Sequence, residues 1–378
     1  MMLLEHDAKE LLGDLGLPIP VGILLGEGSA PSAFDLPVVV KAQVPVGGRG
    51  KAGGIRLART EAERQAAIEA MLGMTIKGHR VGAVRLEQPV DFVTEAYLSL
   101  TIDAASATVR VLMSPNGGID VEDEAARSAL RSETAQLDPA DLVRAVERAS
   151  ANMPEAVRTP LREAGRQLVS AFLEYEAILL EVNPLFIRSD GSWVIGDTKL
   201  IADDNAFQRR PQVRARIETQ PALYPQAALK IAQDYDFVCL DEGGDIGLVT
   251  TGAGLSMQLI DELVARGRRP YNFCDIRTGM FRGDPGRLIQ VFRWISEGPQ
   301  IKVVLINFFA GLSDLGEIAR LLLIALKETP ELKAPIVARL IGNNLEEALA
   351  VIDADGFPIA VETDLERAIQ LALRSAAQ

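Results

Sequence analysis

The chain has 378 residues, more than one hydrophobic core usually serves, so two or three domains are expected. Hydrophobic residues make up 48% and charged residues 24%, a balance that argues against intrinsic disorder. Lys and Arg number 39 against 52 Asp and Glu, so the formal charge is −13, and unspecific binding to nucleic acid or to an anionic membrane is not expected.

The few cysteines and histidines limit the chemistry. Cys239 and Cys274 form neither a CxxC pair nor a zinc-type cluster, which favours a reduced, cytoplasmic setting. His6 falls in "LLEHDAKELL", an expected amphipathic helix, where a surface or capping role is favoured. We therefore expect no Ser-His-Asp or Cys-His nucleophile built within this chain. We also expect neither a signal peptide nor a segment that spans a membrane.

The first half of the chain predicts an α+β domain rich in antiparallel strands. An opening helix ends at "GLPIP", and a strand follows at "LPVVVKAQ". A helix at "AERQAAIEAML" and strands at "VGAVRLEQPV" and "EAYLSLTIDAASATVRVLMS" come next, and then a helical region over 138–175. The stretch "AILLEVNPLFIRSDGSWVIGDTKL" predicts a hairpin that turns at Asp190-Gly191.

The second half repeats a strand–loop–helix pattern. "DIGLVTTGAGLSMQLIDELVARG" and "IKVVLINFFAGLSDLGEIARLLLIALKE" each give a strand, a glycine loop and a helix, and two such units follow. Residue pairs three apart predict helix starts at Asp314, Asn344 and Thr363. The alternation predicts a doubly wound, flavodoxin-like parallel sheet, which binds ligands at the carboxyl ends of its strands. We therefore expect two α/β domains, residues 1–235 and 236–378.

A strand lysine followed by a cationic glycine loop stands out in "VVVKAQVPVGGRGKAGG". Lys41 could place its ammonium against a phosphate, and the loop of Gly48, Arg49 and Gly50 could bring backbone N–H groups close to it. The spacing is neither a P-loop nor a dinucleotide fingerprint. A mobile surface hairpin explains these residues about equally well, so both interpretations stay open on this stretch alone.

The predicted hairpin adds a pair of oxygen ligands. Asn183 lies near the end of one strand and Asp197 on the return strand, so the two side chains can point at one place. Amide and carboxylate oxygens suit Mg²⁺, which takes waters and phosphate oxygens as its other ligands. The alternative is a cross-strand hydrogen-bonded pair. Together with the lysine and the loop, the pair favours a nucleoside triphosphate site.

Several motifs, in the right order and spacing, resemble the β subunit of succinyl-CoA synthetase, a nucleoside-diphosphate-forming acid–CoA ligase. They are "VVVKAQVPVGGRGKAGGIRLA", "LEQPVDFVTEAYLSL", "EVNPLFIRSDGSWVIGDTKLIADDNA", "GDIGLVTTGAGLSM", "VVLINFFAGL" and "IVARLIGNN". The resemblance covers most of the chain, which would be a divergent member. It implies an N-terminal ATP-grasp fold followed by the doubly wound CoA-ligase domain.

The resemblance also implies substrates and partners. These are Mg²⁺, ATP as the nucleotide, CoA bound mainly by a partner, and an α-like subunit in an αβ or α2β2 assembly. Pro20 stands where ATP-preferring relatives carry proline, so ATP is preferred over GTP. In the family the nucleotide phosphorylates a histidine of the α subunit, which agrees with the scarcity of histidines here.

Position by position, the resemblance assigns roles in the first domain. Lys41 and the Gly48-Arg49-Gly50 loop match the contacts to the nucleotide phosphates, and Asn183 and Asp197 match the Mg²⁺ ligands. Glu87 and Glu95 match acidic positions that lie near the ribose and base of the nucleotide in the family. From the residues alone, both would be interpreted as solvated surface carboxylates.

The second domain departs from the family where the acid and the phosphohistidine should bind. Thr251 replaces an asparagine that touches the acid, and after "NFCDI" a run of three glycines and an alanine is reduced to one glycine in "RTGM". Asp314 replaces a cation, although a helix N-cap alone would explain it. The acid and docking residues expected from the resemblance are Thr251, Arg277, Gly279, Arg282, Gly311, Leu312 and Ser313.

These departures favour an acid other than succinate, such as a sulfonated or differently shaped short acid. Arg277 and Arg282 could bind its anionic group by bidentate hydrogen bonds, or both could be solvated residues of a loop. Two alternatives stay open for the whole chain. One is a catalytically impaired or regulatory paralogue that binds nucleotide, and the other is an ATP-grasp ligase that forms an acyl phosphate without a phosphohistidine.

Overall fold

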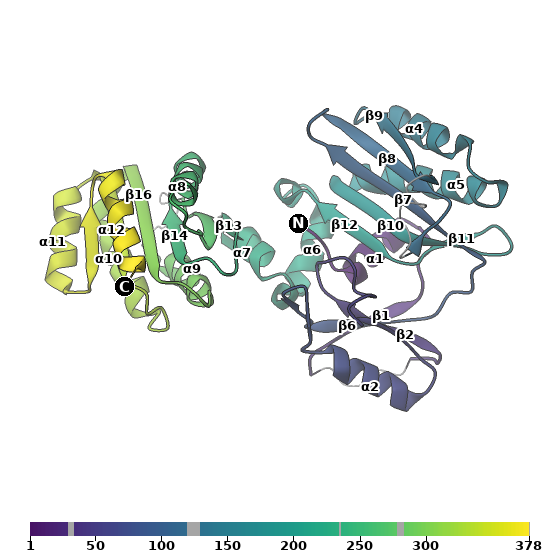
Figure 1. Ribbon diagram of the computed structural model, residues 1–378, viewed down its shortest axis with the longest axis horizontal. Helices are drawn as coiled ribbons and strands as arrows, with labels where there is room; N and C mark the ends of the chain where they lie inside the picture. The colour runs from purple at the N-terminus through teal and green to yellow at the C-terminus, as the bar shows by residue number, and fades with distance from the viewer. Residues whose placement is uncertain (29–33, 119–128, 234–235, 278–282, 378) are drawn as a thin grey trace. The chain divides into compact units, whose positions relative to one another are not determined.

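The computed structural model describes residues 1–28, 34–118, 129–233, 236–277 and 283–377. The chain divides into two compact units, Met1–Tyr224 and Pro225–Gln378, each with its own sheets (Figure 1). Among the described residues, no helix is long and apolar enough to cross a bilayer.

The smaller sheet of the first unit has four antiparallel strands in the order β1-β6-β2-β3. They are β1 (Gly22–Gly26), β2 (Val38–Gln43), β3 (Ile55–Ala58) and β6 (Ala83–Glu87). Helix α2 (Glu61–Met71) packs on this sheet through Ala67 and Met71 and begins at a capping box of Thr60 and Glu63. A two-stranded hairpin, β4 (Thr75–Ile76) and β5 (His79–Arg80), lies between α2 and β6 along the chain.

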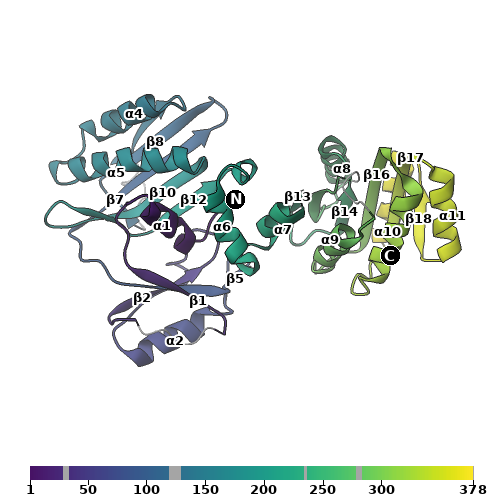
Figure 2. The ribbon, with the colours of Figure 1, turned by 180° about the vertical axis from the view of Figure 1, so that it is seen from behind.

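The larger sheet of the first unit is also antiparallel and runs β11-β10-β7-β8-β9, with β12 beside β10. Its strands are β7 (Thr94–Asp103), β8 (Thr108–Ser114), β9 (Arg131–Ala135), β10 (Ala177–Ile187), β11 (Trp193–Ile195) and β12 (Thr198–Ala202). Helices α4 (Pro139–Ala151) and α5 (Glu155–Glu174) lie over this sheet (Figure 2).

Helix α1 (Glu5–Asp14) joins the two sheets, because it contacts β1 of the smaller sheet and β12 of the larger one. It also contacts α6 (Pro211–Thr219), which follows the short 3₁₀ turn η2 (Asp204–Ala206) and precedes a second, η3 (Pro221–Leu223). The first helix therefore lies where the two sheets of this unit approach one another.

The predicted hairpin turn at Asp190-Gly191 is confirmed. Gly191 has a φ of 80°, a left-handed conformation that glycine adopts without steric cost, and the Arg188 N–H donates to the Ser192 carbonyl at 2.8 Å. The return strand is broken, since β11 ends at Ile195 and β12 begins at Thr198. This break leaves the Gly196 carbonyl and the Asp197 carboxylate to accept hydrogen bonds from side chains.

The second unit has one six-stranded sheet in the order β13-β15-β14-β16-β17-β18, parallel except for β13. Its strands are β13 (Asp236–Cys239), β14 (Ile246–Thr250), β15 (Asn272–Asp275), β16 (Val303–Asp314), β17 (Ile336–Asn343) and β18 (Ile359–Glu362). When β13 is left out and the other strands are numbered in chain order, their order across the sheet is 2-1-3-4-5, the predicted flavodoxin-like arrangement. Its switch point lies between β14 and β16.

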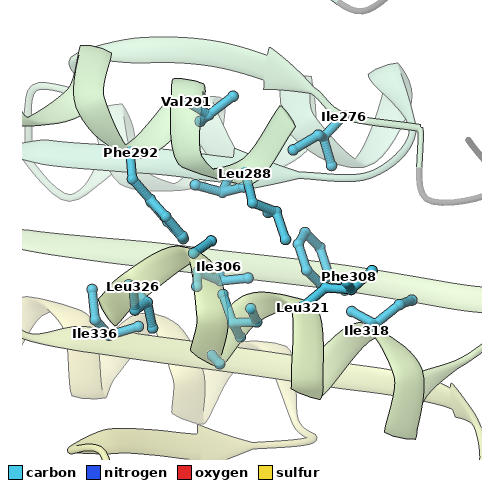
Figure 3. Packing of buried hydrophobic residues seen from close by; sticks show 14 of the residues in the cluster. Ile276, Leu288, Val291, Phe292, Ile306, Phe308, Ile318, Leu321, Leu326 and Ile336 are labelled. Carbon is cyan, nitrogen blue, oxygen red and sulfur yellow. The ribbon is translucent and has the colours of Figure 1, made fainter. Parts of the chain in front are cut away.

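Helices cover both faces of this parallel sheet. They are α7 (Pro225–Gln233), α8 (Ala253–Ala265), α9 (Gly286–Ser296), α10 (Leu315–Lys327), α11 (Leu345–Asp355) and α12 (Leu365–Ala376). Leu248 packs with α8 and α12, while the next residue, Val249, belongs to the cluster formed with α9 and α10. Figure 3 shows part of that second cluster, with Leu288 of α9 and Leu321 of α10. Helix α7, which precedes the expected boundary at residue 235, contacts β13.

The observed N-termini of α10, α11 and α12 can be compared with the three predicted helix starts. The Asp314 carboxylate accepts the Glu317 N–H at 3.0 Å and begins α10, so this N-cap is confirmed. The helix start predicted at Asn344 is confirmed, since Asn344 is the N-cap residue of α11, but its side chain does not cap the helix: the residue is left-handed and its amide donates to Asp314. The Thr363 cap is wrong by one residue, because Asp364 accepts the Arg367 N–H at 2.9 Å.

Two neighbouring phenylalanines of β16 give a matched test of this core. Phe308 is fully buried in the same cluster as Leu288 and Leu321 (Figure 3). Phe309 is 53% exposed. We expect Phe308→Ala to lower the free energy of unfolding by about 3–5 kcal/mol, because it leaves a cavity. Phe309→Ala should change it by less than about 0.5 kcal/mol. Urea unfolding of both variants measures the difference, and equal losses would contradict this packing.

Candidate functional site

Lys41 lies at the centre of a buried group of charges in the first unit. Its ammonium donates to the Gly196 carbonyl at 2.8 Å and forms ion pairs with Glu87 at 2.7 Å and with Glu5 at 2.9 Å. Burial alone would favour the neutral amine, but Glu5, Glu87 and Asp197 raise the pKa of Lys41, so the side chain stays charged. β2 of the smaller sheet thus presents a fixed cation to the hairpin of the larger sheet.

A second lysine, which we did not predict, shares these partners. Lys9 on α1 is fully buried, and its ammonium lies 2.8 Å from Glu5, 2.6 Å from Glu87 and 2.8 Å from the Gly196 carbonyl. The signal in the sequence was a charged i, i+4 pair, Glu5 and Lys9, on the same face of the helix as Leu12. On an exposed face such a pair is ordinary, but on a buried face it marks a site.

The glycine loop is folded inward through Arg49. One guanidinium nitrogen lies 2.8 and 2.7 Å from the two carboxylate oxygens of Asp197 and 2.7 Å from Glu5, and the other donates to the Ala42 carbonyl at 2.9 Å. The side chain is only 6% exposed. A mobile surface hairpin does not describe this loop, because its central cation is buried in ion pairs.

Glycine is required at particular points of the loop. Gly48 and Gly53 both have a φ of 78°, which disfavours a side chain. A Cβ atom on Gly54 would lie 2.8 Å from the Ile76 side chain and 3.2 Å from Ala42. These constraints let the loop turn tightly and close against β2.

Arg85 on β6 adds a fourth buried cation and corrects our expectation for His6. Its guanidinium donates to Glu87 at 2.8 Å and to the Pro20 carbonyl at 3.0 Å, and it contacts the Nδ1 atom of His6 at 2.5 Å. A guanidinium has no acceptor, so Nδ1 of His6 must accept and the ring is neutral. Burial, together with the charge of Arg85, lowers the pKa of His6 to about 4. His6 is therefore half-buried and bonded to Arg85, neither a freely solvated surface residue nor a helix cap.

Glu87 also differs from the solvated carboxylate that the residues alone suggested. It is 3% exposed and pairs with Lys9, Lys41 and Arg85. Burial would raise its pKa, but the two lysines outweigh burial and lower the pKa of Glu87, so it stays ionised. Glu95, half-buried on β7, lies against Gly118, where a Cβ atom would come within 2.4 Å of its carboxylate.

A pocket of about 290 Å³ opens beside these charges. Phe92 and Phe186 stack in its wall with ring centroids 4.3 Å apart. The rest of the lining is apolar apart from a few groups at one end, and includes Val39, Ile55, Leu57, Val90, Lys41, Glu87 and Asp197. An apolar slot with a charged end suits a planar base joined to an anionic group.

Of the proposed metal ligands, Asn183 lies on β10 and Asp197 lies in the break between β11 and β12. The Asn183 N–H donates to the Asp197 carbonyl at 3.0 Å, so the cross-strand contact is between backbone groups. The side-chain oxygen of Asn183 accepts the Gly118 N–H at 2.6 Å, and the Asp197 carboxylate accepts from Arg49 and from the Thr198 N–H. Burial raises the pKa of Asp197, and Arg49 opposes the rise.

The donors of this pair fit a hard cation better than a soft one. Over the described part of the chain, no group of three or more His, Cys, Asp or Glu could hold a metal ion. A cation between Asn183 and Asp197 would therefore need further oxygens from phosphate and water, which is how Mg²⁺ is usually bound.

In the second unit, the expected acid-binding residues lie at the carboxyl ends of the strands, around the switch point. The hydroxyl of Thr251, which follows β14, is buried and accepts the Phe309 N–H at 2.9 Å. Gly311 and Ser313 belong to the end of β16, and the Gly311 carbonyl accepts from Asn343 at 2.9 Å. Arg277, after β15, lies 3.6 Å from Asp236. Gly279, Arg282 and the Leu312 side chain lie outside the described residues.

Comparison with protein families defines the class of this chain. The ATP-grasp domain model matches residues 2–187, and the CoA-ligase model matches residues 249–373. ATP citrate lyase from Methanothrix soehngenii has the same fold, with a TM-score of 0.68 at 18% identity over 99% of both chains. The predicted combination of an ATP-grasp fold with a CoA-ligase domain is confirmed.

Sequence relatives then give the family. The ADP-forming succinate–CoA ligase β subunit of Chloroflexus aggregans is 35% identical over 373 residues, which cover 93% of each chain. The GDP-forming β subunit of Thermus thermophilus is 34% identical over 373 residues, 96% of this chain and 97% of that one. This chain belongs to the family of succinate–CoA ligase β subunits. The expected enzyme class, an ADP-forming acid–CoA ligase, is confirmed at the level of the family.

The depressed pKa of His6 predicts how stability depends on pH. The unfolded chain takes up a proton on this histidine near pH 6.5, whereas the folded chain does so only near pH 4. The stability that His6 contributes is therefore lost as the pH falls through this window. His6→Asn keeps an acceptor for Arg85 and does not titrate.

We expect wild type to lose more free energy of unfolding than His6→Asn between pH 7 and pH 5, by on the order of 1 kcal/mol. Urea unfolding at the two pH values measures this difference. Parallel losses in the two proteins would show that folding does not lower the pKa of His6.

Proposed function

We propose that this chain is the β subunit of an acid–CoA ligase that uses ATP and Mg²⁺ to phosphorylate a histidine on an α-like partner. The phosphate then activates a short carboxylic acid as an acyl phosphate, and CoA attacks it to form a thioester. The observation that carries the proposal is the meeting of Lys41 and Asp197 at the charged end of an apolar pocket, with Arg49 bound to Asp197.

The residues around the pocket account for nucleotide binding. The base fits between the apolar side chains, and the phosphates extend toward Lys41, which acts as a point charge. Backbone N–H groups of Gly48 and Gly50 donate hydrogen bonds to the phosphates, and the planar guanidinium of Arg49 can donate two hydrogen bonds to the same phosphate group. Four buried cations, Lys9, Lys41, Arg49 and Arg85, bring positive charge to this part of the fold, where they pair with the carboxylates of Glu5, Glu87, Asp197 and Glu10.

Asn183 and Asp197 are the residues that would hold Mg²⁺, which when bound offsets phosphate charge. Arg49 occupies both oxygens of Asp197 in this structure, but each carboxylate oxygen can accept from more than one partner. Glu95 and Asn183 both lie against Gly118, so Glu95 is near the metal pair.

An α-like partner supplies the reactive histidine in this proposal. The chain has two histidines, and His6 is committed to Arg85. Relatives such as the Chloroflexus protein are by name subunits of a larger ligase. The partner would also bind most of the CoA, in an αβ or α2β2 assembly.

The nucleotide is proposed to be ATP rather than GTP. ADP-forming and GDP-forming relatives are almost equally similar to this chain, so identity does not separate them. Pro20 favours ATP because ATP-preferring relatives carry proline at this position. Its carbonyl accepts a hydrogen bond from Arg85, and Pro20 is not one of the residues that line the pocket. The proposal predicts tighter binding of ADP than of GDP.

The acid is proposed to differ from succinate. Thr251 is shorter than the family asparagine, and its hydroxyl is already bonded to the Phe309 N–H. Asp314 brings a negative charge to the same edge of the sheet, although its carboxylate is engaged in capping α10. Both changes alter the end of the site where a second carboxylate of succinate would bind.

A regulatory nucleotide-binding paralogue is the second candidate. The loss of the family's glycine run after β15 favours it. The retention of Lys41, Asn183 and Asp197 favours catalysis, because binding without turnover has less need of metal ligands. CoA- and acid-dependent release of ADP by the chain with its α-like partner decides between them.

The first prediction of this proposal concerns Lys41. Lys41→Ala removes the cation that faces the phosphates, while Lys9 still neutralises Glu5 and Glu87. ATP-dependent thioester formation should fall by roughly 100-fold or more while the fold is kept. Coupled assays and thermal unfolding measure the two effects. Lys51→Ala, an exposed lysine of the same loop, is the control and should keep activity within about threefold.

A second prediction concerns the acid. A panel of short carboxylic and sulfonated acids, assayed for CoA-dependent ADP release, should show a preference for an acid other than succinate. Thr251→Asn restores the family's residue and should raise kcat/KM for succinate by roughly tenfold. A clear preference of wild type for succinate would overturn the proposed difference in substrate.

A further inference from the structure

Glu5 connects the strand lysine to the loop arginine. Its two carboxylate oxygens are used separately: one lies 2.9 Å from the Lys41 ammonium and 2.8 Å from that of Lys9, and the other lies 2.7 Å from the Arg49 guanidinium. We propose that Glu5 is a positioning residue, which fixes Lys41 and Arg49 in the arrangement that receives the nucleotide phosphates. This inference rests on the proposed function.

The other buried acids do not make this connection. Glu87 pairs with Lys41, and Asp197 pairs with Arg49. Among the described residues, Glu5 is the one that forms ion pairs with both cations. Without Glu5, each cation would keep an acidic partner, and Arg49 would keep its hydrogen bond to the Ala42 carbonyl of β2, but no carboxylate would pair with both cations.

The burial of Glu5 makes the connection rigid. Its side chain is 1% exposed, so water cannot replace a lost ion pair. Burial would raise its pKa, yet Arg49, Lys41 and Lys9 hold the pKa of Glu5 well below its usual value, and the carboxylate stays charged. Moving one partner out of a buried ion pair would leave the other charge without compensation, which is energetically costly, so the paired groups stay in place.

The backbone around Glu5 is anchored next to Lys41. The N–H of the following residue, His6, donates to the Gln43 side chain at 2.9 Å, and Gln43 lies two residues after Lys41 on β2. On the other side, the Leu4 N–H donates to the Tyr224 hydroxyl at 2.9 Å. The first turn of α1 is therefore held in register with the strand that carries Lys41.

The consequence concerns nucleotide binding rather than the acid or CoA. A phosphate chain needs Lys41 and Arg49 at a defined separation, and preorganised cations bind more tightly than mobile ones. Loss of Glu5 should weaken nucleotide binding, and the acid and CoA sites should be unaffected.

Glu5→Gln tests this inference, because it keeps the size of the side chain and removes its charge. In the chain assembled with its α-like partner, KM for ATP should rise at least tenfold, while KM for the acid and for CoA stays within about twofold. The dissociation constant of MgADP, measured by calorimetry, should rise by a similar factor. Asp14→Asn is the control, since Asp14 ends the same helix in a surface pair with Arg216.

Glu5→Asp is a second variant, which tests the inference if Glu5→Gln does not fold. It keeps the charge but is one methylene too short to reach both cations, so a smaller rise in KM for ATP is expected. Thermal unfolding shows that each variant is folded at the assay temperature. A folded Glu5→Gln or Glu5→Asp protein with an unchanged KM for ATP and an unchanged affinity for MgADP would overturn the inference. Failure of wild type to bind MgADP would overturn the proposed function itself.

Discussion

Buried charges need partners, and this requirement shapes the first unit of the protein. Lys9, Lys41 and Arg85 lie against Glu5 and Glu87 with almost no access to solvent. The five groups come from α1, β2 and β6. The pairs of Lys41 with Glu5 and with Glu87, and of Lys9 with Glu87, therefore join different elements of the fold. Such networks do not necessarily add stability, because desolvation offsets much of the attraction. Their value here lies in fixing several cations beside one pocket.

The same requirement explains the geometry of the proposed nucleotide site. The break between β11 and β12 frees the Gly196 carbonyl, which accepts from both lysines, and places Asp197 against the glycine loop. A Cβ atom on Gly196 would meet the Phe186 ring at 2.5 Å, so the break and the pocket wall depend on one another. In the second unit, Thr251 and Gly311, which we propose belong to the acid site, lie where β14 and β16 end.

Much of this architecture could be predicted from local sequence signals. The Asp190-Gly191 turn, the alternation of strands and helices, and the Asp314 cap each depend on a few adjacent residues, and all are confirmed. The Thr363 cap failed because Asp364, the next residue, offers an equally good acceptor.

Partners distant in sequence could not be predicted in this way. Glu5 and Lys9 have the spacing of an ordinary surface pair, and only the tertiary fold buries them. His6 was assigned to the surface for the same reason, since its partner Arg85 lies 79 residues away. Glu87 pairs with Lys9 across 78 residues. Resemblance to a family pointed to Lys41 and Asp197, but not to the helix that holds their neighbours in place.

The most direct test of this account is the structure of the chain with MgADP bound. We predict that the base lies in the apolar slot beside Phe92 and Phe186, with the phosphates at Lys41 and the glycine loop. The metal should lie at Asn183 and Asp197, with Glu5 still paired to Lys41. A nucleotide bound elsewhere, or bound here without contact to Lys41, would contradict the account.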